Sequence, residues 1–562
     1  MPAEGRARSG ICGVKCGWPL GRLSVMLSKM LDSVRMLWRF SVGLKPFLGS
    51  TLSGEQCRQI VVESMRDRAA SFLELLRRAV YDNPRSPYLA LLRWAGVEFG
   101  DVAGMVRQEG IEATLQKLYD AGVFVRLEEF KGLRPIERLG LELCVRAADF
   151  NNPLLRRDFI AASSGSTGRR QRLAIDLDLL VIEAAYNWVV EQAHGVLTRP
   201  RAIWWPIPPG SAGLKHALRA VKCGRMLDKW FSPTKISWHP REFPSAAFLC
   251  LALCLSRFWK TPIPIPEFTP LEQAWRIAVW LGEQAGHGSP AYLSAPASSI
   301  VRICQAALQT GVDISGSLFR VSGEPYTEAK RRVVVSCGAQ TFSSWSLSEC
   351  GTIAGGCFRA QAIDEVHLYS GKLALIQRPV SLKHDVGTVD AFHLTTLRRE
   401  TPKVLLNVDT GDYGIVSERR CGCPLDELGM TIHVHTIRNY EKLTTSGMHI
   451  LGSDILELVE NLLPQRHGGK PGDYQFVEEA GSPETCVTIV VSRSVKNLKE
   501  EVLLRDVKQF LSKKSRAQRM MLNIWEQGKS IRVVRAEPYT TYTGKTPALR
   551  IVTGSLDSEG LR

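Results

Sequence analysis

The stretch ASSGSTGRRQR, residues 162–172, restricts the fold prediction more than any other part of the chain. Its small residues let a backbone approach a ligand closely, and consecutive N–H groups in such a turn form a concave anion-binding surface. Hydroxyl groups add hydrogen-bond donors, and the arginines add charge. The segment is not a Walker loop, because the Gly-Lys-Ser/Thr ending is missing. On composition alone, a phosphate-binding loop and a flexible linker both stay open.

The composition restricts the class of protein. The chain has 562 residues, 44% of them hydrophobic and 23% charged, and at about 100–200 residues per domain this length corresponds to two to four domains. A disulfide-stabilised mini-protein, a collagen-like fibre and a disordered chain are excluded, since each needs a stronger compositional bias. Lys and Arg number 72 against 56 Asp and Glu, a net charge of +16. Charges of both signs are interspersed, so the excess does not by itself indicate a nucleic-acid partner. An anionic small ligand, such as a nucleotide, is equally compatible with it, and we expect no specific nucleic acid.

Cysteine use and hydropathy predict a cytoplasmic protein. The 14 cysteines are scattered, and without a cleavable signal we expect a reducing compartment. The longest apolar run, Ala246–Ser256, is well short of the about 18–20 residues of a membrane-spanning helix. We therefore expect no transmembrane segment and a buried helix at this run, with an interfacial element as the alternative.

Helical and strand patterns alternate along the chain. Apolar residues at helical spacing predict a helix over 54–79, and further helices are expected over 176–193, 270–285, 297–309, 454–463 and 499–511. Short apolar or alternating runs predict strands over 202–205, 317–321, 367–377 and 486–492. Interleaved helices and strands are typical of an α/β protein. A boundary near residues 438–445 leaves about 120 residues for a small C-terminal unit.

Five further short motifs follow the first stretch in order. They are Gly323-Glu324-Pro325; Trp345, Ser348 and Glu349 in the segment SWSLSE; Thr410-Gly411-Asp412; Arg438, with Gly447 nine residues on; and Gly544-Lys545. In this order they resemble the motifs of the adenylate-forming superfamily, which contains acyl-CoA synthetases, nonribosomal adenylation domains and luciferases. The resemblance covers roughly residues 55–550. It is closest to the phenylacetate-CoA ligase-like branch, which the Cys421-Gly422-Cys423 segment and the compact length also fit.

Two positions depart from the pattern of that family. The first loop lacks the usual lysine after its last glycine, so that its arginines would have to supply the charge. The hinge aspartate expected two residues after Arg438 is replaced by Tyr440, with Glu441 next. The missing lysine bears on catalytic activity. The replaced hinge aspartate bears on the timing of the rotation that the resemblance implies for the small C-terminal domain.

The resemblance implies a two-part α/β fold. A large, multi-sheet N-terminal adenylate-forming domain is expected over residues 46–437, and a small, mobile α+β C-terminal domain over residues 438–562. Residues 1–45 are basic and nearly free of acidic side chains, and a disordered segment and a mis-assigned start both stay open for them.

The resemblance also implies a role for each nucleotide-binding motif. Residues of the first loop would hold the β- and γ-phosphates of ATP: Ser163, Ser164, Gly165, Ser166, Thr167 and Gly168. The turn of Gly323, Glu324 and Pro325 would border the adenine, on which Trp345 would stack, and Ser348 belongs to the same nucleotide-binding segment.

Charged residues would carry the chemistry. Glu349 would bind Mg²⁺, a hard cation that prefers carboxylates and phosphates. Asp412 would accept hydrogen bonds from the ribose hydroxyls, and Arg438 would contact ribose or phosphate. Lys545 would reach the α-phosphate and the carboxylate during adenylation, because its long side chain carries a point charge. Each of these roles has a structural alternative: a surface loop for residues 163–168, core packing for Trp345, an ordinary surface side chain for Glu349, a turn for Asp412, and solvated cations for Arg438 and Lys545.

Cysteine and histidine residues near the middle of the chain suggest a metal site. Cys357, His367, Cys421 and Cys423 provide the four soft or imidazole ligands that a tetrahedral structural zinc needs. The same arrangement occurs by resemblance in some ligases of this branch, and reduced, unrelated thiols are the alternative. His433 and His435 alternate on an expected strand, and we expect surface histidines there.

The sequence thus predicts an ATP- and Mg²⁺-dependent ligase that converts an aryl or acyl carboxylic acid into an acyl-adenylate. Coenzyme A is the expected acceptor, giving a thioester. The alternatives are transfer to an acyl-carrier protein, a protein Cys or an amine, and a non-catalytic nucleotide-binding protein on a degenerate adenylating fold. By resemblance, candidates for the acyl pocket include Trp204, Trp205 and Phe342, and no spacing rule names the acid itself.

Overall fold

The computed structural model describes residues 35–162, 172–208, 210, 212–236, 238–239, 243–382, 387–439, 444–445, 448–449, 452–480, 486–514, 531–541, 544 and 546–553. Residues 35–48 are helical, and the side chains of Phe40 and Leu44 are fully buried. The end of the basic N-terminal segment is therefore folded against the rest of the protein.

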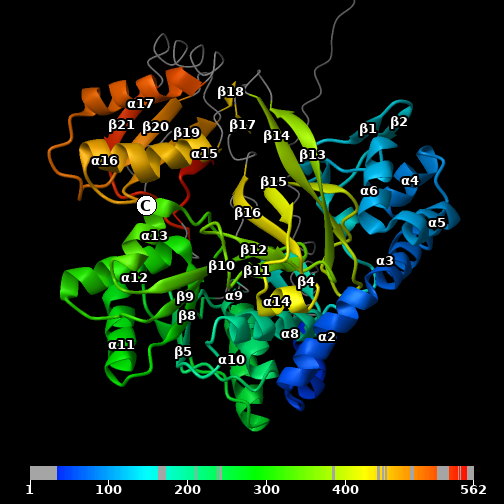
Figure 1. Cartoon of the computed structure of the whole chain (residues 1–562), viewed down its shortest axis with the longest axis horizontal. Coiled ribbons are helices and arrows are strands. Elements are labelled where there is room, and N and C mark those ends of the chain that lie inside the picture. Colours follow the sequence, from blue (N-terminus) through cyan, green and yellow to red (C-terminus); the bar gives the residue numbers. More distant parts are fainter. Residues whose placement is uncertain are drawn as a thin grey trace, which may run out of the picture.

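A twelve-stranded sheet forms the centre of the large part of the molecule (Figure 1). Its parallel half contains, in spatial order, β7 (Glu267–Phe268), β6 (Lys229–Ser232), β5 (Arg201–Trp204), β8 (Tyr292–Pro296), β9 (Leu318–Ser322) and β10 (Gln340–Leu347). Its antiparallel half continues with β11 (Gly351–Gly356), β12 (Val366–Leu368), β16 (Ile432–Asn439), β15 (Val408–Glu418), β14 (Gly387–Thr396) and β13 (Leu373–Leu382). Three two-stranded hairpins lie outside it: β1 (Ile136–Arg138) with β2 (Leu141–Leu143), β3 (Phe159–Ala162) with β4 (Arg172–Ile175), and β17 (Thr444–Thr445) with β18 (Met448–His449).

Helices bury both faces of the parallel half. Strand β5 shows this directly, because its successive side chains point to opposite faces. Ile203 packs in a cluster with α9 (Ala212–Lys222), α10 (Phe243–Phe258) and the helical residues 35–48. Ala202 and Trp204 pack in another cluster with α11 (Ala274–Gly286), α12 (Ala297–Thr310) and α13 (Glu328–Val335). A parallel sheet buried on both faces explains the apolar runs of its strands.

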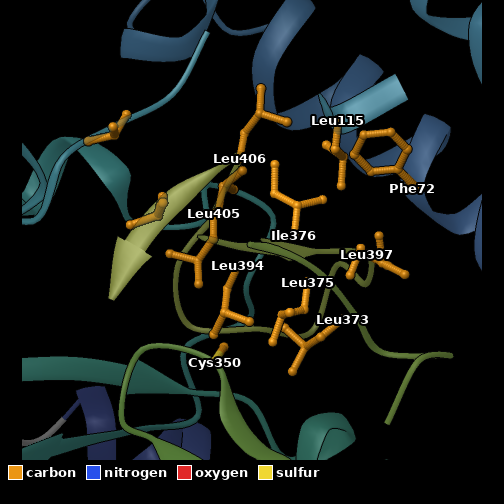
Figure 2. Close-up of a cluster of buried hydrophobic side chains, with 14 of the residues drawn as sticks. Phe72, Leu115, Cys350, Leu373, Leu375, Ile376, Leu394, Leu397, Leu405 and Leu406 are labelled. Atoms are coloured by element: carbon orange, nitrogen blue, oxygen red, sulfur yellow. The ribbon is translucent and has the colours of Figure 1, made fainter. Parts of the chain in front are cut away.

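The N-terminal helices cover the antiparallel half. They are α2 (Gly54–Arg66), α3 (Arg68–Leu76), α4 (Pro87–Trp94), α5 (Phe99–Glu109), α6 (Ile111–Asp120) and α7 (Leu127–Phe130). Figure 2 shows the core between these helices and the sheet, where Phe72 and Leu115 face Ile376 of β13. Helix α8 (Leu177–Ala193) follows the β3–β4 hairpin and packs against α2 and the sheet.

A smaller unit contains the C-terminal part of the chain. Its four-stranded sheet has the order β21 (Ile531–Arg535), β20 (Cys486–Val491), β19 (Tyr474–Ala480) and β22 (Leu549–Thr553). Helices α15 (Gly452–Glu457), α16 (Leu463–His467) and α17 (Glu500–Lys514) share a separate apolar core with this sheet. The expected fold class, a large α/β part followed by a small α+β part, is confirmed, although most strands of the large part join one continuous sheet.

Most of the expected elements are present, and two are divided. The predicted helix over 54–79 is interrupted at Asp67, whose backbone leaves the helical region and whose carboxylate pairs with Arg66 at 2.8 Å. The predicted strand over 367–377 is interrupted by a turn in which the N–H of Lys372 donates to the carbonyl of Tyr369 at 2.8 Å. At residues 369–372 the turn hydrogen bond takes the place of strand pairing, whereas at Asp67 only the backbone angles depart from the helix.

The long apolar run lies in α10, as expected for a buried helix. Phe248, Leu249 and Ala252 of this helix belong to the cluster on one face of the parallel strands. Among the described residues, no helix combines the length and hydropathy that crossing a bilayer requires.

A buried ion network joins α8 to the sheet. Glu183 is 2% exposed, and its carboxylate accepts hydrogen bonds from Lys372 Nζ at 2.9 Å, from Arg219 Nη1 at 2.9 Å and from the N–H of Thr352 at 2.6 Å. Gly351 has a φ of +79°, and a Cβ there would collide with this carboxylate. Burial raises the pKa of Glu183, but Lys372 and Arg219 outweigh it and lower the pKa to about 2.

We expect Glu183→Gln to lower the free energy of unfolding by about 3–5 kcal/mol, because it leaves two buried cations without their carboxylate. Urea unfolding at pH 7 measures this change. A group whose pKa is lowered in the folded state stabilises above its ordinary pKa, which is 4.5 for glutamate. The difference between the two proteins should therefore shrink as the pH falls from 4.5 toward 2.

Glu74→Gln is the matched control. It removes an exposed pair with Arg78 one helical turn away, which contributes about 0.5 kcal/mol or less. Equal destabilisation by the two substitutions would contradict the role of Glu183.

Candidate nucleotide site

The first motif stands in the chain between β3 and β4. Residues 163–171, which include Ser163, Ser164, Gly165, Ser166, Thr167 and Gly168, are outside the described part of the chain. The strands on either side pair antiparallel, with Ala162 opposite Arg172, and β4 leads into α8. The loop predicted to hold phosphates thus connects two paired strands just before a 17-residue helix.

The Gly-Glu-Pro turn comes at the carboxyl end of β9. Gly323 has a φ of +78°, a conformation that favours glycine. One oxygen of Glu324 accepts hydrogen bonds from the hydroxyl and, at 3.0 Å, from the backbone N–H of Ser298 at the start of α12. The other oxygen, Oε1, is buried and has no hydrogen-bond partner among the described residues. The carbonyl of Pro325 accepts from Lys330 Nζ at 2.7 Å.

The small unit contacts the large part next to this turn. The N–H of Thr546 donates to Ser298 Oγ at 3.3 Å, and the hydroxyl of Ser299 donates to the carbonyl of Gly544 at 3.4 Å. Lys545 itself is outside the described residues, but its two neighbours in the chain are both held here.

An ion pair strengthens the same contact. Lys330 Nζ lies 2.9 Å from Glu460 Oε1, and both side chains are almost fully buried. The hydroxyl of Thr327 donates to the other carboxylate oxygen of Glu460. Lys330 therefore joins the carbonyl of Pro325 to a carboxylate of the small unit.

Trp345 and Asp412 meet although 67 residues separate them in the chain. The indole Nε1 of Trp345, on β10, donates to Asp412 Oδ2, on β15, at 3.3 Å. Asn439 Nδ2 donates to Asp412 Oδ1 at 2.8 Å. The Trp345 ring is 8% exposed and packs against Phe392, with centroids 5.4 Å apart. The ring is thus largely a core side chain, and its stacking on adenine stays a prediction.

Glu349 and Ser348 lie in the turn between β10 and β11. Both are half-buried, and among the described residues the Glu349 carboxylate has no hydrogen bond or ion pair. The carbonyl of Glu349 accepts from the N–H of Lys403 at 3.0 Å. Burial lowers the pKa of Lys215 and that of Lys403 to about 8, and the charge of Glu349 opposes both shifts.

Arg438 is held by a carboxylate of the large part. Its Nη1 lies 3.1 Å from Asp364 Oδ2, and Asp364 Oδ1 accepts from the N–H of Thr436 at 2.9 Å. Arg438 is on β16 opposite Tyr413, next to the Asp412–Asn439 pair. The hinge positions Tyr440 and Glu441, and also Gly447, are outside the described residues.

The four predicted metal ligands lie together. Ligand atoms of Cys357, His367, Cys421 and Cys423 are within 4.8 Å of one another. His367 Nε2 is 3.2 Å from Cys423 Sγ and 3.7 Å from Cys421 Sγ, and the Sγ atoms of Cys357 and Cys421 are 3.9 Å apart. The other ring nitrogen of His367 lies 2.6 Å from the carbonyl of Met430.

The prediction of surface histidines is wrong for His433. Its side chain is fully buried, lies 2.6 Å from Glu365 and packs against the His367 ring, with centroids 4.1 Å apart. Alternation along β16 indicated that His433 and His435 share a face of the strand. It did not indicate that Glu365 and His367 cover this face at the position of His433.

Sequence patterns did not identify the buried charged side chains of α8 and α9. Lys215 and Arg219 lie one turn apart on α9, and Arg219 pairs with Glu183 on α8. A signal was present, because Glu183 stands in the apolar segment LDLLVIEAAY, and a carboxylate inside a buried helix needs a cation.

The fold is that of the adenylate-forming enzymes, as the order of the motifs predicted. Two solved structures of 2-hydroxyisobutyryl-CoA ligase in the postadenylation state are similar to the chain. The complex with R3-HIB-AMP has a TM-score of 0.51 at 14% identity and covers 89% of this chain and 90% of that chain. The complex with 2-HIB-AMP has a TM-score of 0.51 at 15% identity and covers 92% of each chain. No family model matches the chain, and no curated protein matches it.

Proposed function

We propose that the protein is an adenylate-forming ligase that activates a carboxylic acid with ATP. A carboxylate oxygen attacks the α-phosphorus, the bond to the bridging oxygen of the β-phosphate breaks, and pyrophosphate leaves. The acyl-adenylate then transfers its acyl group to the thiol of coenzyme A, with release of AMP. Two anions must approach each other in the first step, so cations and oriented donors lower its barrier.

The convergence of distant motifs at the carboxyl ends of neighbouring strands carries this proposal. Ser322 and Ser344 are register partners on β9 and β10, so the Gly323 turn and Trp345 lie side by side. Trp345 reaches Asp412, and Ser298 joins Glu324 to Thr546. Ligands of open α/β sheets bind at this edge.

Individual roles follow from these positions. Asp412 would bind the ribose hydroxyls, since an ionised carboxylate accepts several hydrogen bonds and this one lies beside Trp345. Glu349 fits Mg²⁺, because it is a half-buried carboxylate that makes no other hydrogen bond or ion pair in the described part of the chain. Lys545, between the anchored Gly544 and Thr546, would place its ammonium near the α-phosphate.

The small unit would move between the two half-reactions; its expected range, residues 438–562, includes Arg438 and Asn439, which lie at the end of β16 in the large sheet. The contacts of Gly544 and Thr546 with α12 would correspond to the first of them, because they hold the two chain neighbours of Lys545 next to the Gly-Glu-Pro turn. Transfer to a carrier protein or an amine would use the same first step. We also propose that the chain divides into a large domain, residues 46–437, and a small domain, residues 438–562. Membership of the phenylacetate-CoA ligase-like branch is part of the same proposal.

Carboxylate-dependent pyrophosphate exchange tests the function. We expect exchange with some members of a panel of aryl, fatty and dicarboxylic acids. Lys545→Ala should reduce it by about 100-fold or more, because the variant loses a cation that acts on the developing charge. Lys496→Ala, at an exposed lysine of the small unit, is the control and should leave the rate unchanged. Absence of exchange with every acid, together with absence of ATP binding by calorimetry, would refute the proposal.

We also propose that Cys357, His367, Cys421 and Cys423 hold a structural zinc ion. At a Zn–S distance of about 2.3 Å, a tetrahedral site places two sulfurs about 3.8 Å apart, close to the 3.9 Å between Cys357 and Cys421. A hydrogen bond from Nδ1 of His367 to the Met430 carbonyl would leave Nε2 free as the ligand.

Metal analysis of the purified protein tests this site. We expect about one zinc per chain, its loss in Cys423→Ser, and a lower melting temperature in that variant. Cys254→Ser, at an exposed cysteine of α10, should keep the metal. Native protein that is isolated and reconstituted without bound zinc would show that these are unrelated thiols.

A further inference from the structure

Helix α10 has apolar side chains on both of its sides. Its inner side, with Phe248, Leu249 and Ala252, packs in the cluster on one face of the parallel strands. A surface helix of a globular protein normally has charged or polar residues on the side that faces solvent. The outer side of α10 has instead a row of apolar residues at helical spacing, all exposed or half-buried: Phe243, Ala247, Cys250, Leu251, Cys254 and Phe258. Such a row marks a contact with a partner or a membrane.

Exposed aromatic side chains stand at both ends of α10. Phe243 is 53% exposed at its start, and Phe258 is 77% exposed at its end. Trp238, which is 60% exposed, packs beside Phe243 with ring centroids 6.1 Å apart. An aromatic side chain can bury about 150–250 Å² of surface, so these rings are the largest apolar contacts that the outer side offers.

The helical residues 35–48 extend this side. Phe40 lies beside Phe248 of α10 with ring centroids 4.5 Å apart, and both belong to the cluster on the same face of the sheet. The outer sides of the two helical segments therefore both face away from the sheet. The outer residues of the first segment are all exposed, and they are Arg35, Trp38, Arg39, Val42 and Lys45. We call these residues, together with Trp238 and the outer side of α10, the α10 surface.

The charges at the α10 surface are almost all positive. Neither residues 35–48 nor α10 contain an aspartate or a glutamate, and between residues 229 and 266 five Lys and Arg stand against one acidic residue, Glu242. Asp158, which lies against Gly43, is buried and does not reach this surface. The exposed cations of these segments are Arg35, Arg39, Lys45, Lys235, Arg257 and Lys260. An apolar row bordered by exposed tryptophans and cations is typical of a helix that lies in a membrane interface.

The combination of apolar and basic groups favours a lipid bilayer over other occupants. In a symmetric dimer this surface would meet its own copy, so that cations would face cations with no carboxylate from either helix. A nucleic acid supplies negative charge but no apolar contact for the outer row. A bilayer with anionic lipids supplies both, since its headgroups attract the cations and its acyl chains accept the aromatic rings.

The dimensions of α10 fit a helix that lies along a membrane. Its 16 residues correspond to about 24 Å, less than the about 30 Å of a hydrocarbon core. The protein core occupies its inner side, so lipid can contact the outer side only. Figure 1 shows α10 at the lower end of the molecule and α17 of the small unit at the upper left. Docking through α10 would therefore leave the small unit free to move.

We propose that the α10 surface docks the protein on a membrane that contains anionic phospholipids. The outer side of α10 would lie at the boundary between headgroups and acyl chains, with the cations at the headgroups. This peripheral binding goes beyond the proposed ligase function and does not depend on it.

Co-sedimentation with vesicles tests the docking. The full-length protein is mixed with vesicles of phosphatidylcholine alone, or of phosphatidylcholine with about 30% phosphatidylglycerol. At low salt we expect a partition coefficient at least about tenfold higher for the anionic vesicles, because the exposed cations are attracted to them. Binding should fall but persist at about 0.5 M NaCl, since salt screens exposed charges and does not weaken the burial of apolar groups.

Two exposed cysteines report which side of the protein meets the lipid. Cys254 is on the outer side of α10, whereas Cys144 directly follows β2. Alkylation by a charged, membrane-impermeant maleimide is followed by peptide mass spectrometry. Anionic vesicles should slow the alkylation of Cys254 by at least about fivefold and leave that of Cys144 unchanged, because only the former would lie in the interface.

Substitution of exposed aromatic residues tests the apolar contribution. Trp238→Gln combined with Phe258→Gln should lower the partition coefficient for anionic vesicles by about tenfold or more at both salt concentrations, because less apolar surface is buried. Leu139→Gln is the matched control. Leu139 is 95% exposed in the turn between β1 and β2, and its variant should bind as the native protein does.

Charge reversal tests the electrostatic contribution. Arg39→Glu combined with Lys260→Glu should lower binding at low salt and remove most of its salt dependence. Lys496→Glu, at an exposed lysine of the small unit, should change neither.

Other occupants give different results. Protection of Cys254 that rises with protein concentration in the absence of vesicles would identify a second copy of the chain and overturn the proposal. Vesicle binding that the substitutions at Trp238 and Phe258 leave unchanged would place the lipid contact elsewhere in the chain and reject the α10 surface. Absence of binding to anionic vesicles at low salt would also refute it. Each of these results leaves the ligase proposal standing, because pyrophosphate exchange is measured without vesicles.

Discussion

One oxygen of the Glu324 carboxylate accepts two hydrogen bonds from Ser298, and the Ser298 hydroxyl in turn accepts from the backbone of Thr546. This short chain of hydrogen bonds joins the large sheet, a helix start and the small unit at one point. Ser298 is the second residue of α12, so the carboxylate lies at the positive end of a 14-residue helix dipole. Together with the bond from Ser299 to the carbonyl of Gly544, this contact holds the two chain neighbours of Lys545 against α12.

Buried charges determine where the other parts of the site lie. Glu183 holds Arg219 and Lys372, which fixes α8 and α9 against β11 and β13. Residues of the same helices line a small cavity together with Arg320 of β9. Removing a partner of such a group is costly, because a desolvated charge has no water to replace it. The charged network therefore supports the fold at the centre of the large part.

Sequence patterns predicted the elements that are determined locally. The helices over 176–193 and 297–309 and the strand over 317–321 agree with α8, α12 and β9, because caps and apolar periodicity are short-range signals. The grouping of Cys357 and His367 with Cys421 and Cys423 also followed, from the ligand chemistry of these residues and the close cysteine pair, together with a family resemblance.

Features that depend on contacts between distant parts of the chain could not be predicted from these local patterns. His433 is buried because another part of the chain covers its face, and Arg320 is unusual only because its neighbours on adjacent elements are neutral. A single arginine within the apolar strand LFRVS was a visible signal, but its partners come from α8 and β10. Residues 163–168 and Lys545 lie outside the described residues, so their roles stay predictions.

The central claim is that segments far apart in the chain form one nucleotide site. Hydrogen exchange of the full-length protein, with and without Mg²⁺ and a non-hydrolysable ATP analogue, tests it most directly. The account predicts slower exchange in residues 323–326, 408–413 and 538–548 together, since one ligand would protect all three. Binding of the analogue that protects none of these segments, or only one, would contradict it.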